Sequence, residues 1–205
     1  MKNVRRILST YSADIFGINS ALYELGGLIV MHDASGCNST YNTHDEPRWY
    51  DNPSMIYISA LVEKDVILGN DDKLVNDIVT CVNELPKNKK PKFIVVSSAL
   101  IPFFMCTDMD GIAKKIEAAL GIKTFAFKTN SMSSYIVGTN LAFKMLVDNF
   151  CSDKESNSDR ESNNIKINLI GVTPLDFSIV GNLQSLKKFF EAAGYTINSC
   201  MAMGD

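Results

Sequence analysis

The sequence lacks the patterns that mark several common classes of protein. No run approaches the roughly 18 apolar residues of a membrane-spanning helix. The basic residues 1–10 are not followed by an apolar stretch with a small-residue cleavage site, so we expect no secretory signal. No G-x-G-x-x-G and no P-loop pattern occurs, which leaves a dinucleotide or nucleoside-triphosphate site without motif support.

Cysteine is scarce and scattered. The five cysteines form no C-x-x-C pair, which argues against a zinc ribbon or a thioredoxin-type site. Their odd number, in a chain of 205 residues without an export signal, also argues against a disulfide scaffold. We therefore expect a protein of the reducing cytoplasm. The cysteines are Cys37, Cys81, Cys106, Cys151 and Cys200.

Positive charge is not in excess. The net charge is −3, and the single basic cluster, residues 87–92, precedes an apolar run and is typical of a solvated turn. Nucleic-acid binding is not expected, because it needs a sizeable basic surface. With 46% hydrophobic and 21% charged residues, the composition is that of an ordinary globular protein.

What is present is an alternation of short apolar runs with segments of helical periodicity. Such an alternation predicts an α/β fold, with Rossmann-like parallel sheets covered by helices on both faces. Ligands of such sheets bind beyond the carboxyl ends of the strands, here residues 33–37, 69–71, 97–107 and 128–134. The predicted strands are 28–31, 65–69, 93–96, 124–127, 165–171 and 195–201. The predicted helices are 15–25, about 70–85, 109–120, 135–150 and 182–193.

The pattern breaks near the end of the chain. Residues 152–162 include no apolar residue, so residues 151–164 are predicted to be a flexible linker. Residues 1–150 then form a first Rossmann-like domain. Residues 165–205 carry one β-α-β unit, which we interpret as a partial second Rossmann-like domain. A long polar loop, residues 34–54, interrupts the first domain, and loops of that length tend to be functional or disordered.

Three segments carry a resemblance to a known family. They are residues 31–37 (MHDASGC), residues 61–74 (LVEKDVILGNDDKL) and residues 167–177 (INLIGVTPLDF). Together they resemble the nitrogenase component 1-type oxidoreductases, a family that includes the nitrogenase molybdenum-iron protein, cofactor scaffolds and protochlorophyllide reductases. The E-K-D segment is the most specific of the three. Subunits of this family have three Rossmann-like domains, so the chain would cover the first and the start of the second.

The resemblance implies an oxidoreductase component. Such a component takes electrons from an ATP-dependent iron-protein reductase, through an iron–sulfur cluster at a subunit interface, to a bound substrate. It implies a homologous partner subunit, in a homodimer or a heterodimer. Cys37 falls on one cluster-ligand position of the family, and thiolates suit iron–sulfur clusters. No catalytic residue and no substrate class follows from it.

Two further family cysteines have no counterpart here. Their places are taken by residues 11–13 (YSA) and 97–99 (SSA). Cys106 lies in the same loop as the second of these places and could substitute if the loop folds back. The oxygen ligands that could replace cysteine are Ser12, Asp33 and Ser98. The losses favour a rival hypothesis, a non-catalytic scaffold or binding subunit, or a domain fragment, that keeps the fold without a cluster.

Other polar and aromatic residues have a plain structural interpretation beside a functional one. We favour a core or turn role for His32 over a general acid, and a solvated loop for His44. Residues 63–65 (EKD) fit a charged edge better than a docking site for a reductase. Cys81 lies on the apolar face of a predicted helix, where it packs, and Cys151 and Cys200 receive no role. Trp49 and Tyr50 are interface anchors or pack back on their own domain.

Overall fold

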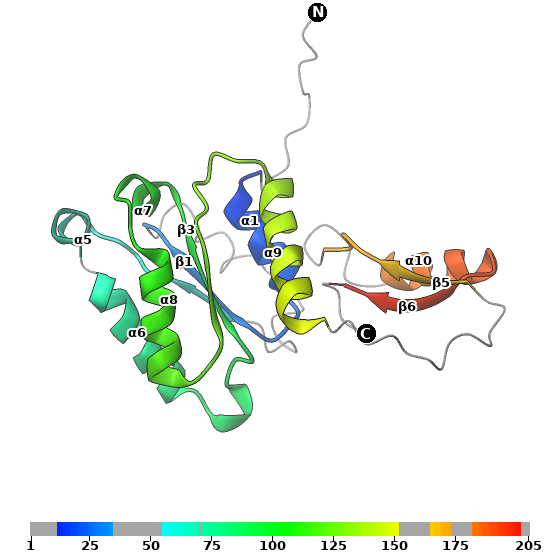
Figure 1. Ribbon diagram of the computed structural model, residues 1–205, viewed down its shortest axis with the longest axis horizontal. Helices are drawn as coiled ribbons and strands as arrows, with labels where there is room; N and C mark the ends of the chain where they lie inside the picture. Colours follow the sequence, from blue (N-terminus) through cyan, green and yellow to red (C-terminus); the bar gives the residue numbers. More distant parts are fainter. Residues whose placement is uncertain (1–11, 35–54, 70, 152–164, 174–181, 202–205) are drawn as a thin grey trace, which may run out of the picture.

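The computed structural model describes residues 12–34, 55–69, 71–151, 165–173 and 182–201 (Figure 1). Two parallel sheets with their helices make up this part of the chain, so the predicted α/β class is confirmed. The four-stranded sheet is built from residues before 130, and the two-stranded sheet lies beyond residue 165. The sheets lie at opposite ends of the molecule in the view of Figure 1.

The first sheet places β1 and β3 at its centre. Its strands are β1 (Leu28–His32), β2 (Met55–Ile58), β3 (Ile94–Ser98) and β4 (Thr124–Phe127), in the order β2-β1-β3-β4. All three pairings are parallel. Every residue of β1 and of β3 is buried, as expected of strands that are covered on both faces. β2 and β3 pair with opposite sides of β1, so the strand order reverses at β1. The carboxyl ends of β1 and β3 therefore flank a topological switch point.

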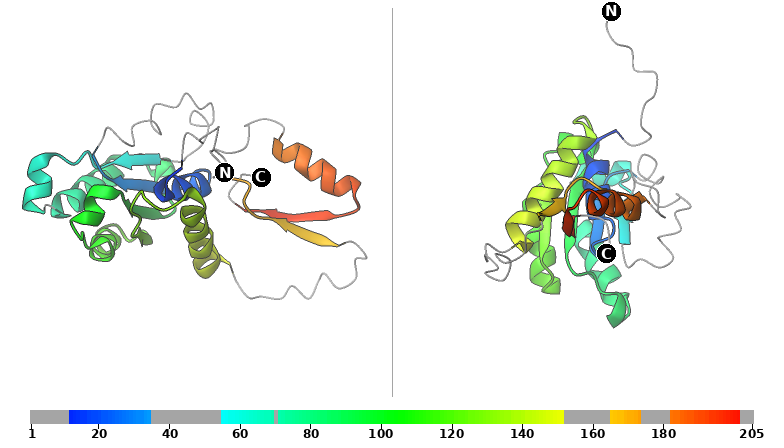
Figure 2. Two further views of the ribbon diagram at one scale, coloured as in Figure 1. Left: turned by 90° about the horizontal axis from the view of Figure 1, so that it is seen from above. Right: turned by 90° about the vertical axis from the view of Figure 1, so that its right-hand side faces the viewer.

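Helices cover both faces of this sheet, as Figures 1 and 2 show. On one face, α6 (Asp71–Glu84) and α8 (Met109–Leu120) pack on the side chains of Leu28, Val30, Ile94 and Val96. On the other, α1 (Asp14–Leu22) and α9 (Tyr135–Phe150) pack on Ile29, Val95 and Phe127. Alternate residues of each strand therefore serve two separate cores.

The α1–α9 contact brings backbone against backbone. A Cβ atom on Gly138 would lie 1.8 Å from the carbonyl oxygen of Asp14, and one on Gly17 would lie 2.1 Å from that of Tyr135. The buried carboxylate of Asp14 accepts hydrogen bonds from the backbone N–H groups of Asn130 (3.1 Å) and Ser131 (2.9 Å). The start of α1 is thus fixed to the segment between β4 and α9.

The second sheet is small. It consists of β5 (Lys166–Leu169) and β6 (Thr196–Cys200) in parallel, with α10 (Asn182–Ala192) packed against them through Leu183, Leu186 and Phe190. It contacts the first unit where the Tyr135 hydroxyl donates a hydrogen bond to Thr173 Oγ1 (3.4 Å) and where Met201 packs on the α1–α9 core. The division into domains stays a prediction, and the predicted linker lies, from residue 152 on, outside the described residues.

The strand predicted at residues 65–69 is wrong. The segment forms a short helix, α5 (Glu63–Leu68), which ends on Gly69 in the left-handed conformation (φ 63°). Its apolar run resembles a buried strand, but Ile67 and Leu68 are 73% and 65% exposed. The carboxylate of Asp65 receives the Val62 N–H at 3.4 Å, which helps to start the helix.

Three further elements were not predicted. They are the edge strand β2, the short helix α7 (Leu100–Phe104) within the predicted loop 97–107, and the 3₁₀ form of the turn that was predicted at residues 87–92, at Lys87–Lys89. The predicted helices at 109–120 and 135–150 and the strand at 124–127 have the observed bounds. The other predicted helices and strands are confirmed within a few residues at each end, which is the usual uncertainty of such bounds.

We predict that Gly138→Ala destabilises the protein by about 3 kcal/mol, because a methyl group has no room against the Asp14 carbonyl. The matched control is Gly111→Ala in α8, where the new methyl meets the side chain of Asp108 instead of backbone, so that the cost is limited to about 1 kcal/mol for the cap hydrogen bond from the Gly111 N–H to Asp108. Urea unfolding of both variants measures the difference. Equal stability of the two variants would contradict the backbone contact.

Candidate functional site

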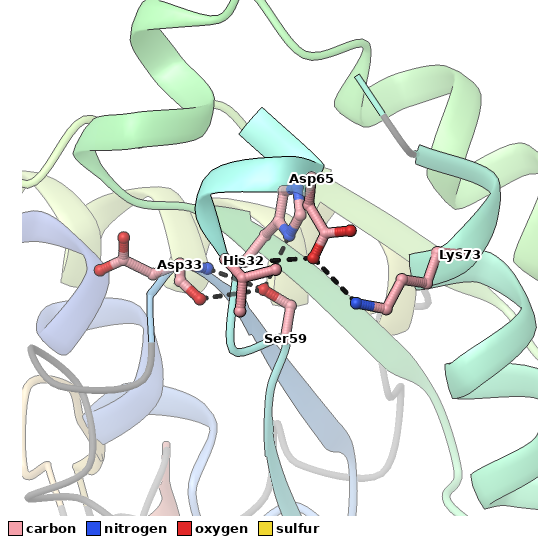
Figure 3. Close-up of polar contacts among 6 residues, drawn as sticks. His32, Asp33, Ser59, Asp65 and Lys73 are labelled. Carbon is pink, nitrogen blue, oxygen red and sulfur yellow. Dashed lines mark hydrogen bonds and ion pairs between the residues drawn. The ribbon is translucent and has the colours of Figure 1, made fainter. Parts of the chain in front are cut away.

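The carboxyl end of β1 is held by one serine. Ser59, the residue after β2, places its Oγ 2.9 Å from Nδ1 of His32 and accepts the backbone N–H of Asp33 at 3.0 Å (Figure 3). The same oxygen lies 3.1 Å from the Asp33 carbonyl oxygen. A hydroxyl donates one hydrogen bond, so its proton goes to that carbonyl or to His32, depending on the imidazole tautomer. Ser59 thereby fixes His32, the last residue of β1, and Asp33, the residue after it.

An ion pair lies beside His32. Asp65 of α5 is buried, and its Oδ2 is 2.8 Å from Nζ of Lys73 in α6 (Figure 3). The hydrogen bond to Asp65 raises the pKa of Lys73. Because Asp65 belongs to α5 and Lys73 to α6, this pair joins the two helices across Gly69. A buried carboxylate is stable as an anion only when it is paired and hydrogen-bonded.

His32 is neutral in this setting. Burial lowers the pKa of His32 from 6.5 to about 4, and the negative charge of Asp65 opposes the shift. Its imidazole is 3% exposed at the switch-point end of β1. A buried neutral imidazole with a hydroxyl partner supports the structural interpretation of His32 over that of a general acid.

Backbone and hydroxyl groups also close the carboxyl end of β3. The Ala99 N–H donates to the His32 carbonyl at 3.1 Å, which joins the ends of β1 and β3. Ser98 Oγ donates to the Thr129 carbonyl (2.6 Å), and Thr129 Oγ1 donates to the Ser98 carbonyl (2.5 Å). Both residues are buried. The Ser98 hydroxyl is thus used to hold the segment after β4 against β3.

Cys106 lies at the same edge, next to a small pocket. It follows α7 in a left-handed conformation (φ 55°), which is uncommon for a residue with a side chain, and it is exposed. The pocket has a volume of about 320 Å³ and includes Ser98, Cys106, Thr107 and Lys128 in its wall. The loop does turn back toward β3, as a substitute ligand position requires, since Cys106 and Ser98 border one cavity.

Comparison with known proteins agrees with this architecture. The sequence model of the family described as nitrogenase component 1 type oxidoreductase matches residues 26–205. The chain belongs to this family. It is 26% identical over 193 residues to the nitrogenase molybdenum-iron protein alpha chain of Methanothermobacter marburgensis, a match that covers 84% of this chain and 38% of that protein.

Solved structures show the same fold. Two structures described as nitrogenase Cp1, at pH 5 and at pH 6.5, match 98% of this chain with TM-scores of 0.66 and 0.65. The identities are 18% and 17%, and the matches cover 40% and 39% of those chains. This member of the nitrogenase component 1 family therefore spans about two fifths of the length of the relatives that it matches.

The structure describes some of the expected ligand positions of this nitrogenase-like chain. Cys37 lies outside the described residues, as do His44, Trp49 and Tyr50. Ser12 is exposed, and its carbonyl accepts the backbone N–H of Tyr135 at 2.7 Å. Asp33 is buried. Within the described ranges, no three His, Cys, Asp or Glu side chains are grouped so that they could hold a metal ion.

Of the remaining cysteines, Cys81 is half-buried on α6, Cys151 is exposed, and Cys200 packs with the small second core. No helix in the described part of the chain is long and apolar enough to cross a membrane.

Sequence reasoning missed two residues of the site, Ser59 and Lys73. The sequence signal for Ser59 is the short apolar run at residues 55–58 (MIYI) just before it, which was not predicted to be a strand. The signal for Lys73 is its position in the first turn of α6, eight residues after the buried Asp65. This signal can be recognised only when residues 63–68 are assigned as a helix.

We predict that acid weakens the fold through His32. The imidazole takes up its proton near pH 6.5 in the unfolded chain but only near pH 4 in the folded one. The unfolded state therefore binds more protons in this window, and the free energy of unfolding falls as the pH drops from 6.5 to 4. We expect the wild type to lose about 3 kcal/mol more than His32→Gln across the window. Urea unfolding at a series of pH values measures both, and parallel curves would refute the prediction.

A second prediction concerns Ser59. Ser59→Ala leaves the Asp33 N–H and the His32 imidazole without their partner, which we expect to cost about 2 kcal/mol of stability. Ser134→Ala is the control, because Ser134 precedes α9 without a side-chain hydrogen bond to it. Thermal unfolding compares the two variants. If both changes cost the same, Ser59 does not hold the end of β1.

Proposed function

We propose that this chain is a subunit of a nitrogenase-like oxidoreductase. It takes electrons from an ATP-dependent iron-protein reductase, by way of an iron–sulfur cluster shared with a homologous subunit, for delivery to a bound substrate. The observation that carries the proposal is the closed switch point of the first sheet, where Ser59, His32 and Ala99 fix the direction in which the chain leaves β1. The proposed ligand Cys37 comes only four residues after Asp33.

Family membership supports the class of protein, and the geometry supports the place of the site. Ligands of open parallel sheets bind outside the carboxyl ends of the strands at the switch point. In this chain that place is bounded by His32 and Asp33 on one side and by Ser98 and Ala99 on the other. These residues are buried and hydrogen-bonded, so they form a rigid base for a site.

The donor atoms fit a shared cluster better than one held by this chain alone. Ser98 is not a suitable ligand, because its hydroxyl is buried and donates to Thr129. Cys106 is suitable, because its thiol is exposed at the same edge. With Cys37, one chain offers two thiols, and two subunits together offer the four that such clusters commonly use. When bound, the cluster would supply one-electron redox chemistry, while this chain supplies the thiols and the rigid edge that carries them.

An exposed apolar surface lies next to the carboxyl edge of the first sheet. Three apolar side chains around α5, those of Val62, Ile67 and Leu68, are between 55% and 73% exposed. Ile67 and Leu68 border a shallow hollow of about 310 Å³ with Glu63 and Lys64. Apolar residues surrounded by charges mark interaction sites. We assign this surface to the reductase partner, which revises our preference for a plain charged edge at residues 63–65.

The rival function is a non-catalytic scaffold or binding subunit of the same fold. One observation favours it. Ser98 lies at a place where the resemblance implies a cysteine ligand, and it is instead part of a reciprocal pair of hydrogen bonds with Thr129. In this rival, the edge and the α5 surface bind partners, and no cluster is held.

Iron and acid-labile sulfide in protein purified without oxygen decide between the two. We expect both in the wild type, loss of both in Cys37→Ala, and a decrease to less than about half in Cys106→Ala. The controls are Cys81→Ala and Cys151→Ala, which change thiols away from the edge and are expected to keep the full content. Sulfide is measured with iron because adventitious iron brings none.

Folded wild-type protein without iron, alone and after reconstitution with iron and sulfide, would refute a cluster held between two copies of this chain and would favour the scaffold. Loss in all four variants alike would also count against the assignment of Cys37 and Cys106. Circular dichroism of each variant confirms that the chain is folded when the metal is measured.

A further inference from the structure

The first sheet is open along β4. In the order β2-β1-β3-β4, β4 pairs with β3 on one side, and no described strand pairs with its other side. Strands at an open edge present unpaired backbone groups to any other strand. Such edges are commonly covered, shortened or charged, so the surroundings of β4 show how this one is used.

The outward groups of β4 can be identified. Ile94 N of β3 donates to the carbonyl of Lys123 at 2.9 Å, so the backbone of Lys123 faces β3. The next residue, Thr124, donates its N–H to Oε2 of Glu117 at 2.9 Å, so its backbone faces away from β3. Backbone direction alternates along a strand. Ala126 therefore turns its N–H and C=O outward, and no hydrogen bond to them from the described residues is seen.

A groove runs along the outward groups of β4. It has a volume of about 550 Å³; α9 forms its wall, and α8 contributes Asp110, which is paired with Lys128. The floor is formed by residues 125–128 of the edge. Leu141 and Met145 make the α9 wall apolar, and Lys144 and Asp148 place one charge of each sign on it. The groove thus combines the open N–H and C=O groups of Ala126 with an α9 wall that is apolar at Leu141 and Met145.

We propose that this groove is an interface for a second copy of the chain, which pairs its own β4 antiparallel to the first and extends the sheet across a two-fold axis. The surface is separate from the edge assigned to the cluster and does not depend on the proposed function. A two-fold axis needs a surface that is complementary to itself. The charges on α9 supply this complementarity.

The charge argument follows from the direction of α9. Phe125 packs on Phe150 with ring centroids 5.9 Å apart, so the carboxyl end of α9 lies beside the start of β4, and the helix runs back along the strand. The middle of the groove wall, between Lys144 and Asp148, is then level with Ala126. An axis through Ala126 brings each Lys144 opposite Asp148 of the other copy.

The α9 face also supplies apolar area. Val137 and Leu141 continue the row of Lys144 and Asp148 at helical spacing, and they are 44% and 38% exposed. Four strand residues are too few to hold a dimer, because stable interfaces bury at least roughly 1,200 Å² in total. Strand pairing joined with contact between the two α9 helices gives the larger area that is needed.

Sedimentation equilibrium of the 205-residue chain tests the proposal. Without a bound cluster, we expect a mass of twice 22.7 kDa for the wild type at micromolar concentrations. Lys144→Asp puts two acidic side chains opposite each other and should raise the dimer dissociation constant roughly tenfold or more. The double variant Lys144→Asp with Asp148→Lys exchanges the charges and should restore the dimer. The control is Lys115→Asp, which reverses an exposed charge that pairs with Asp72 of α6.

A backbone variant gives a second, independent measurement. Ala126→Pro removes the outward N–H and blocks strand pairing, while proline is tolerated at an edge position whose N–H faces solvent. Without a bound cluster, we expect this variant to be a folded monomer by sedimentation and circular dichroism. A monomeric wild type would overturn the proposal, and so would a dimer that survives both Lys144→Asp and Ala126→Pro. Iron content is expected to be the same in Lys144→Asp as in the wild type, which separates this interface from the proposed cluster edge.

Discussion

The contact between α1 and α9 is the constraint on which one whole face of the first sheet depends. Gly17 and Gly138 allow the two helices to touch backbone to backbone, and the Asp14 carboxylate ties the start of α1 to the segment before α9. Because α1 precedes β1 and α9 follows β4, this contact joins the helix that leads into the sheet to the helix that follows it. The buried strands between them are then fixed at both ends, which gives the carboxyl edge its rigidity.

That rigidity is obtained with polar groups at a buried position. Burying a hydroxyl, an imidazole and a carboxylate costs free energy unless each has a partner. Here Ser59 serves three groups at once, and Asp65 is neutralised by Lys73. Networks of this kind give a unique geometry when every member is satisfied. The arrangement suits a site whose ligands must be held in place by the chain before any cofactor or partner arrives.

Much of the fold could be predicted from the sequence, and less of the site. The helices at 109–120 and 135–150 have clear apolar faces and end signals, so their bounds were predicted correctly. The segment of α5 was predicted to be a strand because its apolar run was taken to face the core, whereas Ile67 and Leu68 are exposed. Ser59 was missed because its role arises from parallel pairing of β1 with β2, which brings together residues 27 positions apart. The role of Cys37 stays a prediction.

The reciprocal hydrogen bonds of Ser98 and Thr129 have a consequence for any attempt to redesign this edge. A thiol at position 98 would be larger and a poorer hydrogen-bond donor than the hydroxyl, so it would loosen the connection between β3 and the segment that leads to α9. That segment also binds Asp14, and through Asp14 it positions α1. A cysteine at position 98 would therefore also weaken the support of the helix pair on the far face. The hydroxyl at position 98 is thus part of the support of the fold, and its effect extends from β3 to the start of α1.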